Sequence, residues 1–180
     1  MKKSQIRKII LKRRLNFNLK ERKINYLNLI KLLKTVSKNK KIGLYYPIGT
    51  EVSTIEIIQY LRRKKYIISL PVLEKNSQMS FYEWNERGPL KINNFGIPEP
   101  IKFKKITPTT LIIPIVAFDA KLNRIGYGGG FYDRFISKLE KTKKILKIGL
   151  ALSCQKINKV PTNRFDKKMN YILTENKVYK

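Results

Sequence analysis

The residues best suited to chemistry lie in a glycine-rich segment between Arg124 and Asp133. Four of the nine glycines fall inside it, at positions 126, 128, 129 and 130. Glycines let backbone N–H groups converge on one anionic point, and a helix expected to start near Phe131 adds its positive end. The segment lacks the G-K-S/T ending of a Walker A loop, and the third glycine of a dinucleotide fingerprint would fall at Phe131. The pattern predicts a phosphate cradle, with a plain strand-to-helix turn as the alternative.

Carboxylates near this segment could bind a divalent cation. The chain has no histidine, so an oxygen-liganded hard cation such as Mg²⁺ is the ordinary choice of metal. Asp133, in the first turn of the expected helix, is one candidate ligand, and a helix-dipole role is its alternative. Asp166 is a second candidate, although a surface turn residue is the simpler interpretation. For Asp119 we favour a structural role that orders its loop, by pairing with Arg124, over a role as third ligand.

A glutamate and two aromatic residues could bind a heterocycle. Glu51 lies just past an expected strand end, in a chain with only 12 acidic residues. Its carboxylate could accept hydrogen bonds from ring N–H groups, while Tyr46 and Trp84 could stack on the ring. The alternative for Glu51 is an acidic residue in the first turn of a helix.

The composition excludes several mechanisms. Without histidine there is no Ser-His-Asp triad and no Cys-His pair, and a single cysteine allows neither an internal disulfide nor a cysteine-rich zinc site. The 40 basic and 12 acidic residues give a net charge of +28, which favours anionic ligands. Because the lysines are spread along the chain, a compositional bias explains this charge better than a selected basic surface.

No segment predicts targeting or membrane insertion. Residues 9–11 are three apolar residues before Lys12, too few for a signal peptide. The longest uncharged stretch, 106–118, has 13 residues and two prolines, whereas a bilayer takes roughly 20. We therefore expect a cytoplasmic protein with no membrane partner.

Apolar strand patterns alternate with helical patterns. We expect helices over 3–15, 20–37, 52–64 and 131–142, and strands over 42–46, 66–70, 79–84, 111–116, 145–152 and 171–174. Pro71 should end the second strand, 79–84 suits an antiparallel edge, and 96–100 reads as irregular. Strands that are apolar on both faces are typical of parallel sheets covered on both sides.

The expected fold is therefore α/β: a largely parallel central sheet flanked by helices in a Rossmann-like three-layer arrangement, with a small antiparallel edge. The length of 180 residues suits one domain over 1–180. Ligands of such sheets bind beyond the carboxyl ends of the strands. Three segments leave strand ends there: 46–51, 70–75 and 117–130.

Together these motifs resemble the 5-formyltetrahydrofolate cyclo-ligase (methenyltetrahydrofolate synthetase) family, almost from end to end. The most specific part is 114–119 (PIVAFD), 124–126 (RIG) and 128–134 (GGGFYDR), close to the family pattern P-x-x-A-F-D, R-L-G and G-x-G-[FY]-Y-D. Segments 46–54 and 96–100, short elements after Val160, and a K-x-x-x-R pair at Lys3 and Arg7 extend the resemblance.

The resemblance implies an enzyme that converts 5-formyltetrahydrofolate and MgATP to 5,10-methenyltetrahydrofolate, ADP and phosphate. In the implied mechanism the formyl oxygen attacks the γ-phosphate of ATP. N10 then attacks the activated carbon, and phosphate leaves. Such chemistry requires alignment and charge stabilisation more than a covalent protein group, which suits a chain without histidine.

The motifs also carry over site residues. ATP would contact Lys3, Arg7, Arg124, Ile125, Gly126, Tyr127, Gly128, Gly129, Gly130, Phe131 and Tyr132. Tyr46, Glu51 and residues 127–131 would contact the folate, Asp133 and Asp166 would bind Mg²⁺, and Lys3 and Arg124 would act as catalytic residues. Two departures are Tyr127 and Gly129, which stand where relatives often carry a basic residue.

Two other functions fit the same sequence less well. A nucleic-acid-binding protein would use the +28 charge, but would need exposed aromatic residues interleaved with the basic ones. Another ATP- or sugar-phosphate-dependent enzyme could use a similar scaffold. We expect reduced folate and ATP as small-molecule partners, no specific nucleic acid, and a monomer.

Overall fold

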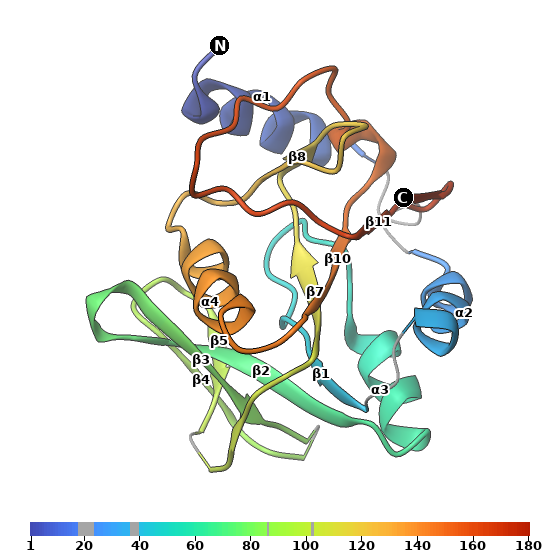
Figure 1. The fold of residues 1–180 in the computed structure, drawn as a ribbon, viewed down its shortest axis with the longest axis vertical. Helices are drawn as coiled ribbons and strands as arrows, with labels where there is room; N and C mark the ends of the chain where they lie inside the picture. The colour runs from blue at the N-terminus through green and yellow to red at the C-terminus, as the bar shows by residue number, and fades with distance from the viewer. Residues whose placement is uncertain (18–23, 37–39, 86, 102) are drawn as a thin grey trace.

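The computed structural model describes residues 1–180 except 18–23, 37–39, 86 and 102 (Figure 1). Its helices are α1 (Lys3–Leu15), α2 (Tyr26–Val36), α3 (Ile55–Arg63) and α4 (Phe131–Glu140). Its strands are β1 (Lys41–Gly43), β2 (Ile67–Glu74), β3 (Gln78–Glu83), β4 (Leu90–Ile92), β5 (Pro98–Pro100), β6 (Lys105–Ile106), β7 (Thr110–Pro114), β8 (Ala117–Phe118), β9 (Arg124–Ile125), β10 (Leu146–Leu150), β11 (Tyr171–Leu173) and β12 (Val178–Tyr179).

A mixed sheet forms the centre of the molecule, in the order β12-β11-β10-β7-β1-β2-β3-β6. The strands from β11 to β2 pair in parallel. Strand β12 joins one side antiparallel, and β3 and β6 join the other in the same way. The predicted fold class, an α/β protein with a largely parallel central sheet flanked by helices, is confirmed.

Apolar residues on both faces of the sheet hold the helices in place. In β7, Ile112 packs into the cluster that contains α2 and α3. Its neighbours Leu111 and Ile113 point the other way, into the cluster that contains Ile136 of α4. Successive side chains of a strand point to opposite faces of the sheet, so a continuous apolar run packs against the helices on both faces. Figure 1 shows α4 on one side of the sheet and α2 with α3 on the other.

Several predicted boundaries need correction. Pro71 does not end the second strand, since β2 continues to Glu74 with Pro71 opposite Phe81. Parallel pairing of β2 with β1 stops at Ser69. Pro71 therefore lies where β2 no longer pairs with β1, and the missing backbone N–H of proline is tolerated there.

The antiparallel region is also larger than predicted. Strand β3 is not the outermost, because β6 pairs with its Phe81 and Tyr82. Within the segment 96–100, β5 forms a separate two-stranded sheet with β4. The predicted helix 20–37 begins partly outside the described residues, and α2 starts at Tyr26. In the part of the chain that the structure describes, no helix has the length and apolar character to cross a membrane.

A small hairpin of β8 and β9 leads from the sheet toward the glycine-rich segment. Helix α1 packs on it through Ile6 and Ile10, in one cluster with Val116, Ala117 and Ile125. The buried Asp119 orders the turn between the two strands. Its carboxylate accepts hydrogen bonds from the backbone N–H groups of Lys121 (2.9 Å), Asn123 (3.1 Å) and Val160 (3.0 Å). The expected structural role of Asp119 is thus what the structure shows, without the expected pairing to Arg124.

Replacing Asp119 with alanine should destabilise the protein in a pH-dependent manner. Burial raises the pKa of Asp119, but hydrogen bonds from Asn123, Val160 and Lys121 outweigh it and the pKa is lowered. Its stabilisation is therefore complete above the unfolded-state pKa of about 3.9 and is lost as the pH falls through the folded-state value. We expect a loss of about 1–3 kcal/mol at neutral pH, measured by urea unfolding.

The difference between wild type and Asp119→Ala should shrink on acidification to about pH 3. Glu83→Gln is the control, because Glu83 forms a largely exposed ion pair with Lys104 and should cost little. A difference that does not change with pH would contradict the role assigned to the Asp119 carboxylate.

Candidate active site

All residues predicted to contact ATP, folate or Mg²⁺ through the family resemblance line one cavity of about 1110 Å³ at the carboxyl ends of the parallel strands. Lys3 and Arg7 come from α1, Tyr46 and Glu51 from the segment after β1, and Asp166 from the segment between β10 and β11. The glycine-rich segment and α4 supply the rest. The lining residues among those predicted are Lys3, Arg7, Tyr46, Glu51, Arg124, Ile125, Gly126, Tyr127, Gly128, Gly129, Gly130, Phe131, Tyr132, Asp133 and Asp166.

The glycine loop needs its glycines for two reasons. Gly128 and Gly130 have φ angles of +115° and +66°, a region that other residues adopt only with strain. At Gly129 a Cβ atom would lie 2.5 Å from the Phe131 ring. Gly130 is the N-cap of α4, whose first N–H groups have no partner within the helix. The loop therefore presents bare backbone N–H groups and the positive end of a helix to the cavity.

Arg7 is fixed against this loop. Its Nε donates a hydrogen bond of 2.7 Å to the carbonyl oxygen of Gly126, and a Cβ at Gly128 would lie 3.3 Å from the Arg7 guanidinium carbon. Helix α1 thus adds a fixed cation beside the glycine loop.

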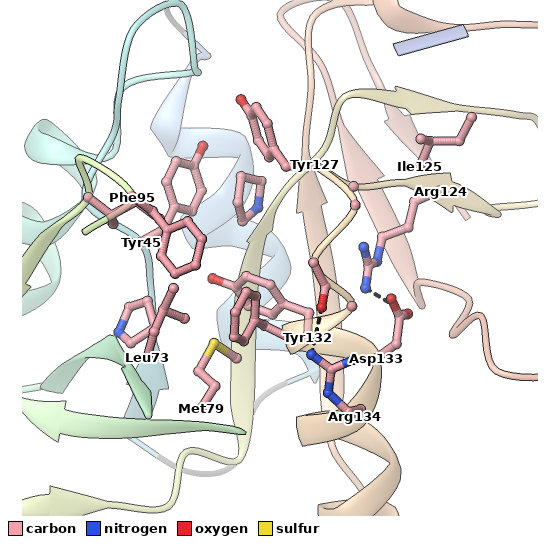
Figure 2. A pocket seen from close by; sticks show the side chains of 18 of the residues that line it. Tyr45, Leu73, Met79, Phe95, Arg124, Ile125, Tyr127, Tyr132, Asp133 and Arg134 are labelled. Carbon is pink, nitrogen blue, oxygen red and sulfur yellow. Dashed lines mark hydrogen bonds and ion pairs between the residues drawn. The ribbon is translucent and has the colours of Figure 1, made fainter. Parts of the chain in front are cut away.

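Each predicted metal ligand is paired with a predicted phosphate-binding cation. Arg124 Nη2 donates to Asp133 Oδ1 at 2.8 Å, and Figure 2 shows this ion pair at one wall of the cavity. Lys3 Nζ lies 2.6 Å from Asp166 Oδ2. Arg124 therefore pairs with Asp133, which corrects the expected pairing with Asp119. The Nε of Arg124 is buried and has no hydrogen-bond partner among the described residues.

The donor set fits Mg²⁺ only in part. Within the described residues, no group of three or more His, Cys, Asp or Glu side chains is placed to hold a metal ion. Mg²⁺, however, is commonly bound through one or two carboxylates together with substrate phosphates and water. Asp133 and Asp166 supply that number of carboxylates beside the glycine loop, so they are compatible with a metal that arrives with a nucleotide.

Aromatic residues of the same cavity lie around the Glu51 carboxylate. Glu51 is 9% exposed, and its Oε2 accepts a hydrogen bond of 3.0 Å from the N–H of Ile48. Burial raises the pKa of Glu51, while this N–H, Tyr127 and Arg14 lower it in part. Burial and the nearby Glu51 charge also raise the pKa of Tyr132, whose buried hydroxyl has no partner among the described residues. Unpaired buried donors of this kind are available to a ligand.

One aromatic residue and one aliphatic residue, Trp84 and Ile125, lie differently from expectation. Trp84 is buried in the core and is not one of the described residues that line the cavity, so its predicted stacking on a ligand ring is wrong. Its ring instead packs edge-on against Tyr46 at 6.1 Å, which does line the cavity. Ile125 reaches the cavity although its side chain packs beneath α1, and Figure 2 shows it directed away from the other labelled side chains.

Sequence reasoning missed one wall of the cavity. Leu73 of β2, Met79 of β3 and Phe95 in the turn between β4 and β5 lie across from the glycine loop (Figure 2). The Phe95 and Phe131 rings are 6.2 Å apart. Glu99 of β5 fixes this wall, because its Oε1 accepts a 2.7 Å hydrogen bond from the N–H of Leu73. Apolar residues carry no chemical signal in a sequence, and only the expected strand end at 70–75 and the motif at 96–100 pointed to this region.

Comparisons with known proteins agree with this geometry. Residues 1–175 match the model of the 5-formyltetrahydrofolate cyclo-ligase family. The chain is 37% identical to 5-formyltetrahydrofolate cyclo-ligase of Haemophilus influenzae over 71% of both chains. It is 32% identical to that of Mycoplasma genitalium over 85% of this chain and 86% of the relative.

Solved structures give the same result. The NMR structure of Aquifex aeolicus 5,10-methenyltetrahydrofolate synthetase superposes with a TM-score of 0.80 at 31% identity, covering 100% of this chain and 93% of that one. The Mycoplasma pneumoniae 5,10-methenyltetrahydrofolate synthetase superposes with a TM-score of 0.77 at 23% identity, which shows a shared fold. Sequence motifs, fold and cavity lead to one conclusion: this chain belongs to the 5-formyltetrahydrofolate cyclo-ligase family.

Proposed function

We propose that this chain catalyses the ATP-dependent cyclisation of 5-formyltetrahydrofolate to 5,10-methenyltetrahydrofolate, with release of ADP and phosphate. The observation that carries the proposal is that two unlike sets of residues, here called the two ends of the site, line one cavity. One end has the glycine loop with its cations and carboxylates. The other has aromatic residues around the buried Glu51. A nucleotide and a reduced folate would meet between them, in a member of the cyclo-ligase family.

At the nucleotide end, the chain would bind phosphates through the loop N–H groups, Lys3, Arg7 and Arg124. These donors are held in place before substrate arrives, and fixed donors stabilise developing phosphate charge without reorganisation. Asp133 and Asp166 would hold Mg²⁺, which neutralises phosphate charge when bound. Binding of a metal nucleotide would let the two ion pairs of the free protein exchange partners, with carboxylates turning to the cation and basic side chains to phosphate.

At the folate end, Glu51 would accept hydrogen bonds from ring N–H groups, and Tyr46 and Phe131 would flank the ring. This orientation aligns the formyl oxygen with the γ-phosphate. An O–P bond forms there while the bond to ADP breaks. N10 then attacks the activated carbon, the C–O bond breaks, and phosphate and the N10 proton leave.

The proposal describes a cytoplasmic, single-domain enzyme that acts as a monomer on small molecules rather than on nucleic acid or a membrane. The cavity supports it, because residues of one chain supply both ends. Light scattering during size-exclusion chromatography measures the oligomeric state directly.

The direct test follows the methenyltetrahydrofolate absorbance band. Purified protein is mixed with 5-formyltetrahydrofolate, with and without MgATP. The proposal requires an increase in the methenyltetrahydrofolate absorbance that depends on both the protein and MgATP. No rise at high protein concentration, alongside an active control enzyme, would contradict it, and RNA binding through the basic surface would become the next assay.

Asp133→Asn should lower turnover by at least about tenfold while the protein stays folded. The amide keeps the size of the side chain but loses the charge that attracts the metal. Turnover measured across Mg²⁺ concentrations should show a higher requirement for the ion. Glu140→Gln is a matched control, because Glu140 lies on the same helix but pairs with Lys147 and Lys167. Normal turnover of Asp133→Asn at low Mg²⁺ would show that the metal assignment is wrong.

Glu51→Gln should weaken folate binding by about tenfold or more and ATP binding by less than about threefold, since one charge-assisted hydrogen bond is worth about 1.5–3 kcal/mol. Separate calorimetric titrations with each ligand measure the two affinities. Equal losses for folate and ATP would place Glu51 outside the folate subsite.

A further inference from the structure

Arg14 is a buried cation that the proposed mechanism does not use. It lies in the last turn of α1, is 3% exposed, and is not one of the described residues that line the cavity. Removing a guanidinium from water is costly unless its donors find partners. The partners of Arg14 therefore indicate what its burial accomplishes.

The guanidinium joins the two segments that carry the proposed folate contacts. Its Nε donates to Thr50 Oγ1 at 2.7 Å, and its Nη2 donates to the Tyr127 hydroxyl at 2.8 Å. The guanidinium carbon also lies 5.8 Å from the centre of the Tyr127 ring. Thr50 directly precedes Glu51, and Tyr127 belongs to the glycine loop. The Arg14 side chain, which lies outside the cavity lining, thus holds together two segments of that lining.

The direction of these hydrogen bonds is set by chemistry. A guanidinium has donors only, so the Tyr127 hydroxyl must accept from Arg14. The single hydrogen of that hydroxyl is then available to the nearby Glu51 carboxylate, whose pKa Tyr127 lowers. The result is a polar chain that runs from Arg14 through Tyr127 to Glu51. The N–H of Ile48 holds the carboxylate as well, at 3.0 Å.

We propose that Arg14 is a positioning residue for the folate: acting through Tyr127 and Thr50, it holds Glu51 as an ionised acceptor in a defined orientation. The inference rests on the proposed function, which gives Glu51 its task. It goes further because Arg14 touches neither substrate. Since Lys3 and Arg7 lie on the same rigid helix, Arg14 also sets the position of the ATP contacts relative to the folate contacts.

The charge of Arg14 matters as well as its geometry. Burial raises the pKa of Glu51. The Ile48 N–H and Tyr127 oppose this shift, and Arg14 is the described cation that adds to their effect. Tyr45, Tyr127 and Tyr132 also face Glu51, and their pKa values are raised, so they stay neutral at ordinary pH. Loss of Arg14 should raise the pKa of Glu51 further. Folate binding, which needs the ionised carboxylate, should then fail at a higher pH on acidification.

The test measures folate and ATP affinities separately by calorimetry, between about pH 5 and pH 8. Arg14→Gln should weaken folate binding about tenfold or more and ATP binding less than about threefold. As the pH is lowered, this variant should lose folate binding at a higher pH than the wild type. Arg14→Lys keeps the charge and should show a smaller pH shift. It should still bind folate weakly, because an ammonium cannot reproduce the planar fork of a guanidinium.

Arg13→Gln is the matched control. It removes the same charge from the neighbouring position of the same helix, where Arg13 is exposed and donates to the carbonyl of Cys154 at 3.2 Å. Both affinities and the pH profile should match those of the wild type. Tyr127→Phe tests the same chain of hydrogen bonds with the buried cation retained, and should also shift the folate profile to higher pH.

A double-mutant cycle separates positioning from general stability. If Arg14 acts through Glu51, Arg14→Gln should cost little folate affinity once Glu51→Gln is present. Additive losses, equal losses for both ligands, or unchanged folate binding in Arg14→Gln would each overturn the inference. Wild-type protein that binds ATP but no folate would instead overturn the proposed function and, with it, this role of Arg14.

Discussion

The ion pair between Arg124 and Asp133 closes the glycine segment into a loop, and the rest of the site is arranged around it. Arg124 lies in β9 of the β8–β9 hairpin and Asp133 lies in the first turn of α4, so the 2.8 Å contact joins the two supports of the loop. The Arg124 side chain is 4% exposed, which leaves it in a medium where charges interact strongly. Between these two points the backbone can be glycine-rich and still hold its shape.

Helix α1 is the second support. It packs through Ile6 and Ile10 on the β8–β9 hairpin, and its polar face reaches the site at three positions. Lys3 forms an ion pair with Asp166, Arg7 donates a hydrogen bond to the carbonyl of Gly126, and Arg14 donates one to the Tyr127 hydroxyl. One amphipathic helix therefore fixes the loop from outside while delivering its own cations. Because an α-helix is stiff over this length, the three contacts move as a unit.

This strongly basic protein has few carboxylates, and several of them lie in the site. Only 12 of 180 residues are acidic, yet Glu51, Glu99, Asp133 and Asp166 all line the same cavity. Each is held by specific donors: Ile48 N–H for Glu51, Leu73 N–H for Glu99, and a basic side chain for each aspartate. These contacts hold the four carboxylates in fixed positions where ligands would use them.

The sequence by itself determined the fold class, because uncharged runs such as 111–116 with alternating helical patterns suit only a covered parallel sheet. It also indicated the residues of the proposed nucleotide end of the site, since glycines and charged residues at close spacing signal their chemistry directly. Only the tertiary structure decided which charges pair, because Lys3 and Asp166 lie 163 positions apart. It likewise decided that Trp84 is core and that Leu73, Met79 and Phe95 form a wall. The role inferred for Arg14 came from tertiary packing too, since a third basic residue on a basic helix looks ordinary until its burial and its partners across the fold are known.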